Sequence, residues 1–202
     1  MQGVRNEKLA TESWRIQAQI LHFGDWRLLW INVYFPNDPR IINFDEAELL
    51  VVQAQLRAVL NNGGYDGCIC GGDWNYDARR NSGFAISMAA FLDEVGLVSV
   101  WEKFPVDFTY MHTDNKSTSI LDNFYVNDAL LPYVENAGPL HLGDNLSGHS
   151  PILLHLGVSN IPSRTEEEEV RVPRRLAWQK ADSDQIWEYK EVLEKKLEEL
   201  ED

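Results

Sequence analysis

Four groups of polar side chains interrupt or follow apolar stretches of this chain, and together they offer the functional groups that cleave a phosphodiester. A carboxylate can activate water, amide and phenol groups can hold a phosphate, and a histidine can stabilise charge on the phosphate oxygens. In a layered protein, polar groups at strand ends can converge on one cleft. The four groups are Tyr34 with Asn37, Asp73 with Asn75, Asp122 with Asn123, and Ser147-Gly148-His149.

The segment around Asp73 is the most informative of the four. An apolar run ends at Gly71 and Gly72 and is followed by Asp73 and, two residues later, by Asn75. Because residues i and i+2 of a strand point to the same side, we expect both side chains to face one pocket. Taken alone, the pair also fits a simple turn after two glycines.

A carboxylate is expected behind the histidine. Such a group fixes the tautomer of an imidazole and favours its protonated form, and Asp122 is the candidate partner of His149. Arg79 and Arg80 follow Asp73 closely and form either a local basic patch or ordinary solvated surface.

The remaining histidines and the tryptophans are assigned structural roles. Trp74, inside the Asp73 segment, is a candidate to line the cleft. We expect packing or surface roles for the other four histidines, because none lies at metal-ligand spacing from cysteine or acidic pairs. We expect four tryptophans to anchor the core. These residues are His22, His112, His141 and His155, and Trp14, Trp26, Trp30 and Trp101.

Strands alternate with helices along the chain, which indicates an α/β arrangement of layers. Alternation and apolar runs predict the strands, and apolar residues at helical spacing predict the helices. Gly24-Asp25 predicts a hairpin turn. The predicted strands are residues 14–20, 27–34, 67–71, 119–126, 138–142 and 152–156, and the predicted helices are residues 45–60, 83–95 and 128–134.

Composition limits the class of protein. The hydrophobic content of 44% is that of a globular chain, and no apolar run is long enough to span a membrane. The N-terminus lacks the plan of a signal peptide, and Cys68 and Cys70 are typical of small buried residues in a reducing compartment. We expect an intracellular protein, in nucleus or cytoplasm. The net charge of −14 does not suit sequence-independent binding to nucleic acid through basic side chains.

The C-terminal part of the chain differs from the rest. Residues 158–180 predict a polar, acidic linker, and residues 181–202 predict an amphipathic helix that begins near Asp182. Because such a helix is too short to be stable alone, we expect it to dock on a partner or on a further segment of a polyprotein. The main domain is expected over residues 1–157.

The four motifs resemble those of the endonuclease/exonuclease/phosphatase superfamily, in the same order and at similar spacing over residues 12–157. An Asn-Val-Tyr-x-Pro-type strand occurs at 32–37, Gly-Asp-x-Asn at 72–75, and Leu-Asp at 121–122. The closing Ser-Asp-His occurs as Ser147-Gly148-His149. Within the superfamily, residues 34–39, 106–109 and 117–126 and the Pro-Arg-x-x-x-Trp segment at 173–178 most resemble the nuclease of non-LTR retrotransposons.

The resemblance implies an α/β (α+β) fold, a partial four-layer αββα sandwich of mixed sheets, followed by a linker and a C-terminal helix. It implies hydrolysis of DNA phosphodiesters with Mg²⁺ or Mn²⁺. Asp73 would activate water and Asn75 would orient it. Tyr34 and Asn37 would contact the phosphate, His149 would stabilise the transition state, and Asp122 would orient His149.

Two departures from the family pattern predict weak or no activity. The chain begins after the early strands that supply a metal-binding Glu, and Gly148 stands where the family has Asp. The metal ligands are therefore left unassigned, and metal binding by this chain is in doubt. A domain without its N-terminal third also leaves apolar residues without neighbours, and we expect this for Ile16, Ile20, Leu29 and Ile31.

Two alternatives remain open at this point. One is a catalytically silent interaction module derived from the same fold, which the two departures favour. The other is a phosphatase that acts on a small or lipid phosphate, which would use the same site residues.

Overall fold

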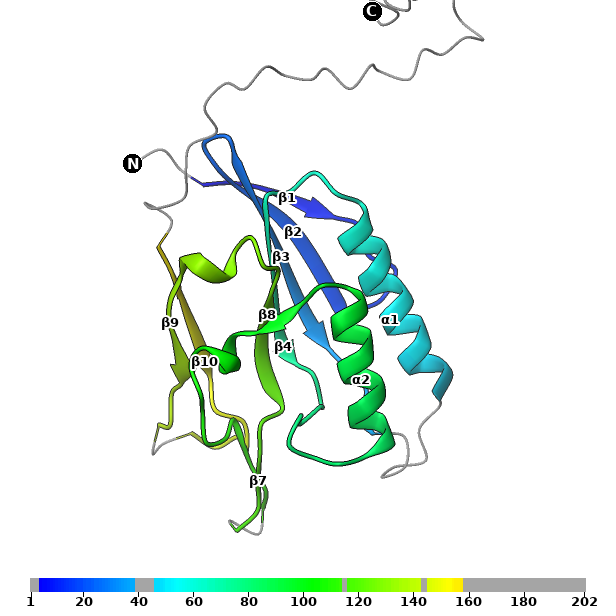
Figure 1. The fold of residues 1–202 in the computed structure, drawn as a ribbon, viewed down its shortest axis with the longest axis vertical. Coiled ribbons are helices and arrows are strands. Elements are labelled where there is room, and N and C mark those ends of the chain that lie inside the picture. Colours follow the sequence, from blue (N-terminus) through cyan, green and yellow to red (C-terminus); the bar gives the residue numbers. More distant parts are fainter. Residues whose placement is uncertain (1–3, 39–45, 114–115, 143–144, 158–202) are drawn as a thin grey trace, which may run out of the picture. The chain divides into compact units, whose positions relative to one another are not determined.

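The computed structural model describes residues 4–38, 46–113, 116–142 and 145–157 (Figure 1). Its centre is a six-stranded mixed sheet with strand order β1-β2-β3-β4-β8-β5, in which only β3 and β4 run parallel. The strands are β1 (Arg5–Leu9), β2 (Ile16–Phe23), β3 (Trp26–Tyr34), β4 (Gly67–Asp73), β5 (Val98–Ser99) and β8 (Asp122–Val126).

Helices α1 (Glu46–Asn61) and α2 (Gly83–Glu94) cover one face of this sheet (Figure 1). Ser82 caps α2, because its side chain accepts a hydrogen bond from Ala85 N at 3.1 Å, and Gly96 ends the helix with a positive φ of 67°. Ile16, Leu29 and Ile31 lie fully buried in the core between the helices and the sheet. The expectation that these three would lose their neighbours is therefore wrong.

A second, smaller sheet lies over the other face. It consists of β9 (Val134–Pro139) and β10 (Ile152–Leu156), which pair antiparallel. Two short 3₁₀ helices, η1 (Val100–Glu102) and η2 (Leu131–Tyr133), contribute to the same side. The core on this face includes Leu28, Ile69, Val100, Phe124, Val126 and Leu130. The resulting helix–sheet–sheet layers confirm the predicted partial sandwich.

The hairpin of β2 and β3 formed as predicted. Phe23 pairs with Trp26 across the turn, and Gly24 takes the positive φ of 61° that such a turn needs. Strand β3 is interior, between β2 and β4. Its apolar side chains face both cores, which explains why its sequence does not alternate.

Three predictions about the second half of the chain are corrected. Residues 128–134 form only the 3₁₀ turn η2, and the strand expected at 138–142 begins earlier, as β9. The strand expected at 119–126 is two strands, β7 (Thr118–Ser119) and β8, and β7 forms a small hairpin with β6 (Tyr110–Met111). Pro132 near the start of η2 favours a short turn, and the backbone pairing of β9 with β10 decides the rest.

The exposure of two tryptophans is the opposite of what the sequence predicted. Trp74 is fully buried and stacks on Phe35 at 4.9 Å between ring centroids, so it does not line the cleft. Trp14 was expected to begin a strand and to anchor the core, but β2 begins two residues later and Trp14 is 72% exposed. Strand β1 was not predicted, because its sequence lacks apolar alternation and its backbone pairing with β2 forms it.

The predicted linker at 158–180 and the predicted helix at 181–202 lie outside the described residues. Among the residues that the structure does describe, no helix is long and apolar enough to cross a membrane.

Gly72 is required by the close approach of two strands. Its φ is +142°, and a Cβ there would lie 2.1 Å from Val33 O. We predict that Gly72→Ala lowers the free energy of unfolding by about 3 kcal/mol or more, through backbone strain and overpacking. Gly24→Ala, which has a positive φ but open space around it, should cost only about 1 kcal/mol. Urea denaturation followed by circular dichroism measures both, and equal losses would contradict the steric argument.

Candidate active site

A cavity of about 330 Å³ opens where β3 and β4 end. Five of the six predicted site residues line it, namely Tyr34, Asn37, Asp73, Asn75 and His149. The sixth, Asp122, lies directly behind His149. The structure therefore brings together the six predicted site residues, whereas Asn123 and Ser147 of the same motifs do not line the cavity.

The register of three strands sets the floor of this site. Tyr34 pairs with Asp73 across β3 and β4, and Asp73 pairs with Asp122 across β4 and β8. Directly opposed residues of neighbouring strands point to the same face. Asn123, one residue further along β8, points to the other side, where its side-chain amide hydrogen-bonds Ser99 Oγ at 2.9 Å. Asn123 is thus structural.

Asn75 reaches the pocket by a different route from the one predicted. Strand β4 ends at Asp73, and Asn75 takes a left-handed conformation with φ of 47°. Its backbone N–H donates to Asp73 Oδ1 at 2.9 Å, and its side-chain amide donates to Phe35 O at 2.8 Å. The sequence had suggested either a shared pocket or a simple turn for Asp73 and Asn75. Both are present, because the two residues form a turn and also line the same pocket.

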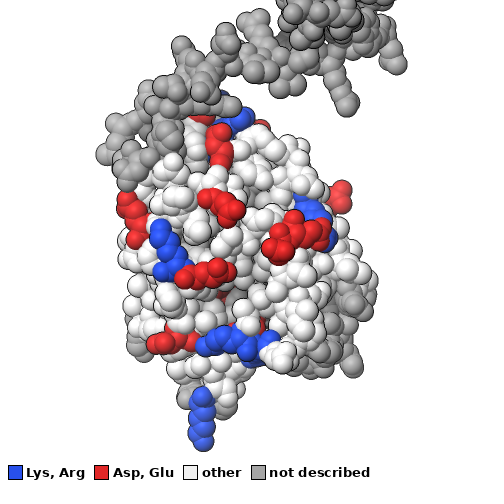
Figure 2. All heavy atoms as spheres, in the orientation of Figure 1, with Lys and Arg blue, Asp and Glu red and all other residues white. Residues whose placement is uncertain are grey.

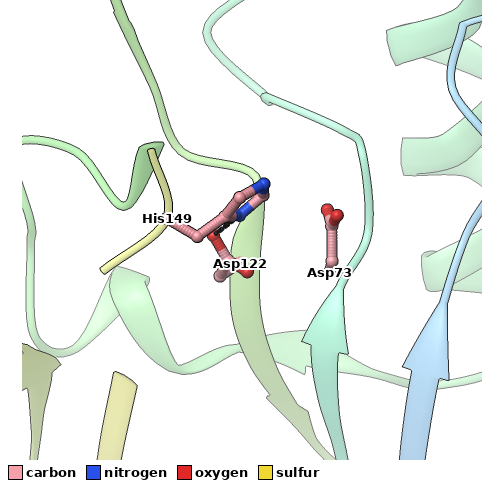
Figure 3. A group of neighbouring side chains, drawn as sticks. All are labelled: Asp73, Asp122 and His149. Atoms are coloured by element: carbon pink, nitrogen blue, oxygen red, sulfur yellow. Dashed lines mark hydrogen bonds and ion pairs between the residues drawn. The ribbon is translucent and has the colours of Figure 1, made fainter. Parts of the chain in front are cut away.

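His149 is held by a carboxylate on one side and an aromatic ring on the other. Its Nδ1 lies 2.9 Å from Asp122 Oδ2, which leaves Nε2 for the cavity. The ring of Tyr110 packs against it at 4.6 Å between centroids. Figure 3 shows the imidazole on top of Asp122 and directed toward Asp73, so that the three side chains meet from three separate parts of the chain.

Thr109 fixes the backbone that carries Asp122. This buried hydroxyl accepts hydrogen bonds from Leu121 N and Asp122 N, both at 2.9 Å. The carbonyl of Thr109 accepts from Ser150 N at 2.7 Å, next to His149. One residue thus ties the strand of the carboxylate to the loop of the histidine. The sequence did not predict this role, because a single threonine carries no motif that would indicate it.

Burial raises the pKa of the Asp73 carboxyl to about 6. The hydrogen bond from Asn75 N and the nearby imidazole of His149 oppose this rise, whereas the charge of Asp122 adds to it. A carboxylate with a pKa close to the working pH is a stronger base than an ordinary one. The geometry therefore gives Asp73 the properties of a proton acceptor.

The donor set also fits one divalent cation. Asp73, Asp122 and His149 each offer a ligand atom, and these atoms lie within 4.8 Å of one another. Oxygen ligands suit Mg²⁺ and Mn²⁺. Asp122 already binds His149, so Asp73 is the carboxylate that is left for a cation, and its raised pKa is typical of an acid without a compensating positive charge.

Arg80, which the sequence left as either a basic patch or solvated surface, and His112 also line the cavity. The Arg80 guanidinium donates to Ser119 Oγ at 2.7 Å, and His112 Nε2 lies 3.2 Å from the same hydroxyl. His112 had been assigned a packing or surface role. Arg79 differs from Arg80, because it binds the buried carboxylate of Asp77 at 2.8 Å. Arg80 thus lines the pocket, whereas Arg79 stabilises the scaffold. The sequence could not distinguish these two roles.

Asp77 holds this part of the wall in place. Burial would raise its pKa, but hydrogen bonds from the Arg79 side chain and from Ile120 N and Arg79 N keep the pKa of this carboxyl below its usual range. The contact with Ile120 N, at 3.0 Å, links the loop after β4 to the residues just before β8.

Solved structures of nucleic-acid enzymes share this fold. AP endonuclease LMAP from Leishmania major matches with a TM-score of 0.60 and 16% identity, over 76% of this chain and 61% of that chain. The endonuclease domain of TRAS1, a telomere-specific non-LTR retrotransposon, matches with a TM-score of 0.62 and 15% identity, over 76% and 67%. The 3′ phosphatase NExo from Neisseria, bound to product DNA hairpin, matches with a TM-score of 0.56 and 16% identity, over 77% and 70%.

The chain has the fold of the endonuclease/exonuclease/phosphatase superfamily. It spans about 61% of the length of the Leishmania enzyme. No family model matches the sequence, and no curated protein matches it either. At identities of 15–16%, the likeness concerns the fold, and the site has to be argued from its own geometry.

Because the folded protein raises the pKa of Asp73 from 3.8 to about 6, the carboxylate should destabilise the fold at neutral pH. The wild type therefore loses stability as pH rises from about 4 to about 6. The Asp73→Asn variant lacks this loss, because Asn cannot ionise. The shift corresponds to at most about 3 kcal/mol, and partial exposure reduces it. We predict that Asp73→Asn raises the free energy of unfolding by about 1–2 kcal/mol at pH 7.5 in EDTA, with no gain at pH 3.5.

Denaturant titrations at the two pH values measure this difference. Asp93→Asn, which removes an exposed carboxylate on α2, is the matched control and should show no such gain. A loss of stability in Asp73→Asn at pH 7.5 would contradict the assignment of Asp73 as a half-buried acid whose charge is incompletely compensated.

Gly148 cannot simply be replaced by the Asp of the family pattern. A Cβ at this position would lie 2.7 Å from the Tyr110 ring and 2.8 Å from Met111 O. We predict that Gly148→Asp lowers the free energy of unfolding by about 1–3 kcal/mol and does not increase hydrolysis, because it displaces the ring that packs on His149. Gly148→Asp combined with Tyr110→Ala removes the clash with the ring but keeps the one with Met111 O, and Tyr110→Ala alone shows what loss of the ring does to hydrolysis. A stable single variant with faster hydrolysis would contradict this prediction.

Proposed function

We propose that this protein is a metal-assisted phosphodiester hydrolase that acts on nucleic acid. The observation that carries the proposal is the 2.9 Å hydrogen bond between His149 Nδ1 and Asp122 Oδ2, opposite the Asp73 carboxylate in one cavity. A half-buried carboxylate and an oriented imidazole suit this hydrolysis, since one accepts the proton of water and the other stabilises charge on the phosphate.

Each pocket residue has a role in this reaction. Tyr34, Asn37 and Arg80, which all line the cavity, contact the phosphate in this proposal. Asp73 accepts a proton from the attacking water as the new P–O bond forms, and Asn75 orients that water. The P–O bond to the leaving oxygen breaks, while His149 stabilises the negative charge on the phosphate oxygens. Asp122 acts through His149 and is a positioning residue.

Asp73, with Asp122 beside it, would hold a Mg²⁺ or Mn²⁺ ion. Such an ion, when bound, offsets phosphate charge and makes water more acidic. Because Mg²⁺ is commonly held by one or two carboxylates plus water and phosphate, the cavity suits a cation that binds weakly without substrate and more tightly with it.

We expect slow turnover. Within the described part of the chain, Asp73, Asp122 and His149 are the only acidic and histidine groups that gather as possible ligands, and Gly148 contributes none. Loss of one ligand or its support commonly reduces activity 10- to 100-fold. We further propose that the substrate is DNA that is nicked, as in non-LTR retrotransposon endonucleases. The motif at residues 34–39 and the shared fold of the TRAS1 endonuclease domain support this.

Hydrolysis of supercoiled plasmid and of bis(p-nitrophenyl) phosphate tests the proposal. We predict slow hydrolysis that requires Mg²⁺ or Mn²⁺ and is abolished by EDTA. His149→Ala and Asp73→Asn should each reduce the rate about 100-fold or more. His155→Ala, which removes an exposed imidazole on β10, and Asp93→Asn are the matched controls and should retain the wild-type rate.

Equal rates for the wild type and His149→Ala would show that the pocket is not catalytic and would favour the silent interaction module. A strong preference for phosphomonoesters over both diesters would instead assign the site to a phosphatase.

A further inference from the structure

Trp14 is a large apolar side chain that the fold leaves at the surface, 72% exposed. It precedes β2, and its ring lies 5.9 Å from the Tyr34 ring, centroid to centroid, at an angle of 47°. The guanidinium of Arg15 lies 4.4 Å from the centroid of Trp14 and 4.9 Å from that of Tyr34. The three side chains form one cluster, which we call the Trp14 platform.

The platform is built rather than incidental, because Arg15 is fixed from several sides. Its Nε donates to Glu48 Oε1 at 2.7 Å, and its Nη1 donates to Tyr34 O at 3.3 Å. The Arg15 side chain is only 12% exposed. In the backbone, Tyr34 N donates to Arg15 O at 2.9 Å. Arg15 supports Trp14 from one side through a cation–π contact, which leaves the exposed part of the indole for a ligand.

Tyr34 connects the platform to the proposed phosphate site. Its ring contributes to the platform, and the same residue lines the cavity and pairs with Asp73. A ligand that places a phosphate in the cavity can therefore extend past Tyr34 toward Trp14. In a polynucleotide, the sugar joined to that phosphate carries a base with a flat aromatic face.

The charge of the protein gives a reason for such a contact. The chain carries a net charge of −14, and on the face shown in Figure 2 most Lys and Arg side chains lie beside Asp or Glu rather than in a continuous patch. Affinity for a polyanion cannot then come mainly from phosphate neutralisation. Stacking of bases on aromatic rings needs no positive charge and tolerates any base.

We propose that the Trp14 platform stacks a nucleobase adjacent to the phosphate held in the cavity. The inference rests on the proposed hydrolase function and deepens it, because a base-stacking site makes a polynucleotide the substrate class rather than a small or lipid phosphate. Trp14 is a binding residue in this account, and Arg15 positions it.

Binding of the full chain to a 5′-fluorescein single-stranded oligonucleotide of about ten nucleotides, in EDTA to prevent hydrolysis, tests the platform. We expect Trp14→Ala to weaken binding roughly 5- to 100-fold, with Trp14→Phe in between. The factor should change little with salt, because stacking releases no counterions. Leu50→Ala, which shortens an exposed apolar side chain on α1, is the matched control and should bind like the wild type.

A second probe isolates the base. On an oligonucleotide of equal length made of abasic residues, wild type and Trp14→Ala should bind equally, because the partner of the indole is missing. Equal affinity of the two proteins for the normal oligonucleotide would overturn the platform and would favour a protein partner for Trp14. If Trp14→Ala weakened binding to the abasic probe as much as to the normal oligonucleotide, the platform would also be overturned.

The outcomes for the platform and for the hydrolase are distinguishable. A wild type that hydrolyses bis(p-nitrophenyl) phosphate, together with a Trp14→Ala variant that binds the oligonucleotide normally, overturns the platform alone. Weakened binding in Trp14→Ala together with no metal-dependent hydrolysis by the wild type supports the platform and overturns the hydrolase. Because Trp14 is mostly exposed, the variant should fold, and thermal unfolding checks this.

Discussion

The pairing register of β3, β4 and β8 is the constraint on which the site depends. It places Tyr34, Asp73 and Asp122 side by side at one level of the sheet. A slip of one residue would turn the side chains of a strand to the opposite face. Gly72 helps to set this register, because only a residue without Cβ lets β4 approach Val33 so closely. His149 and Asn75 are then held by hydrogen bonds to Asp122 and Asp73, respectively.

Placing acids in a partly buried row is energetically unfavourable, and the surrounding structure partly compensates. Asn75 N hydrogen-bonds Asp73, the imidazole of His149 accompanies Asp122, and Thr109 fixes the backbone beneath. The compensation at Asp73 is incomplete, as its raised pKa indicates. Carboxylates with such a raised pKa are common at sites that bind a cation or transfer a proton. The energetic cost of the ionised Asp73 carboxylate is thus related to its proposed role.

Gly148 lies close to the residues that support His149. Where the family pattern has a carboxylate next to the histidine, this chain has glycine, and the ring of Tyr110 and the carbonyl of Met111 occupy the space near it. The same ring packs on His149. The glycine thus leaves room for a ring that packs on the oriented histidine.

The sequence by itself determined the hairpin at Gly24, the two helices, the buried strand before Asp73 and most of the pocket residues, because apolar periodicity and turn residues act locally. It did not reveal β1, the true start of β9 or the exposure of Trp14, since these depend on which strand is available to pair. It also could not separate Arg79 from Arg80, and it assigned no role to Asn123, the neighbour of Asp122. Only tertiary structure decided these pairs, because neighbours in sequence point to different partners once Asp77, Ser119 and Ser99 are in place.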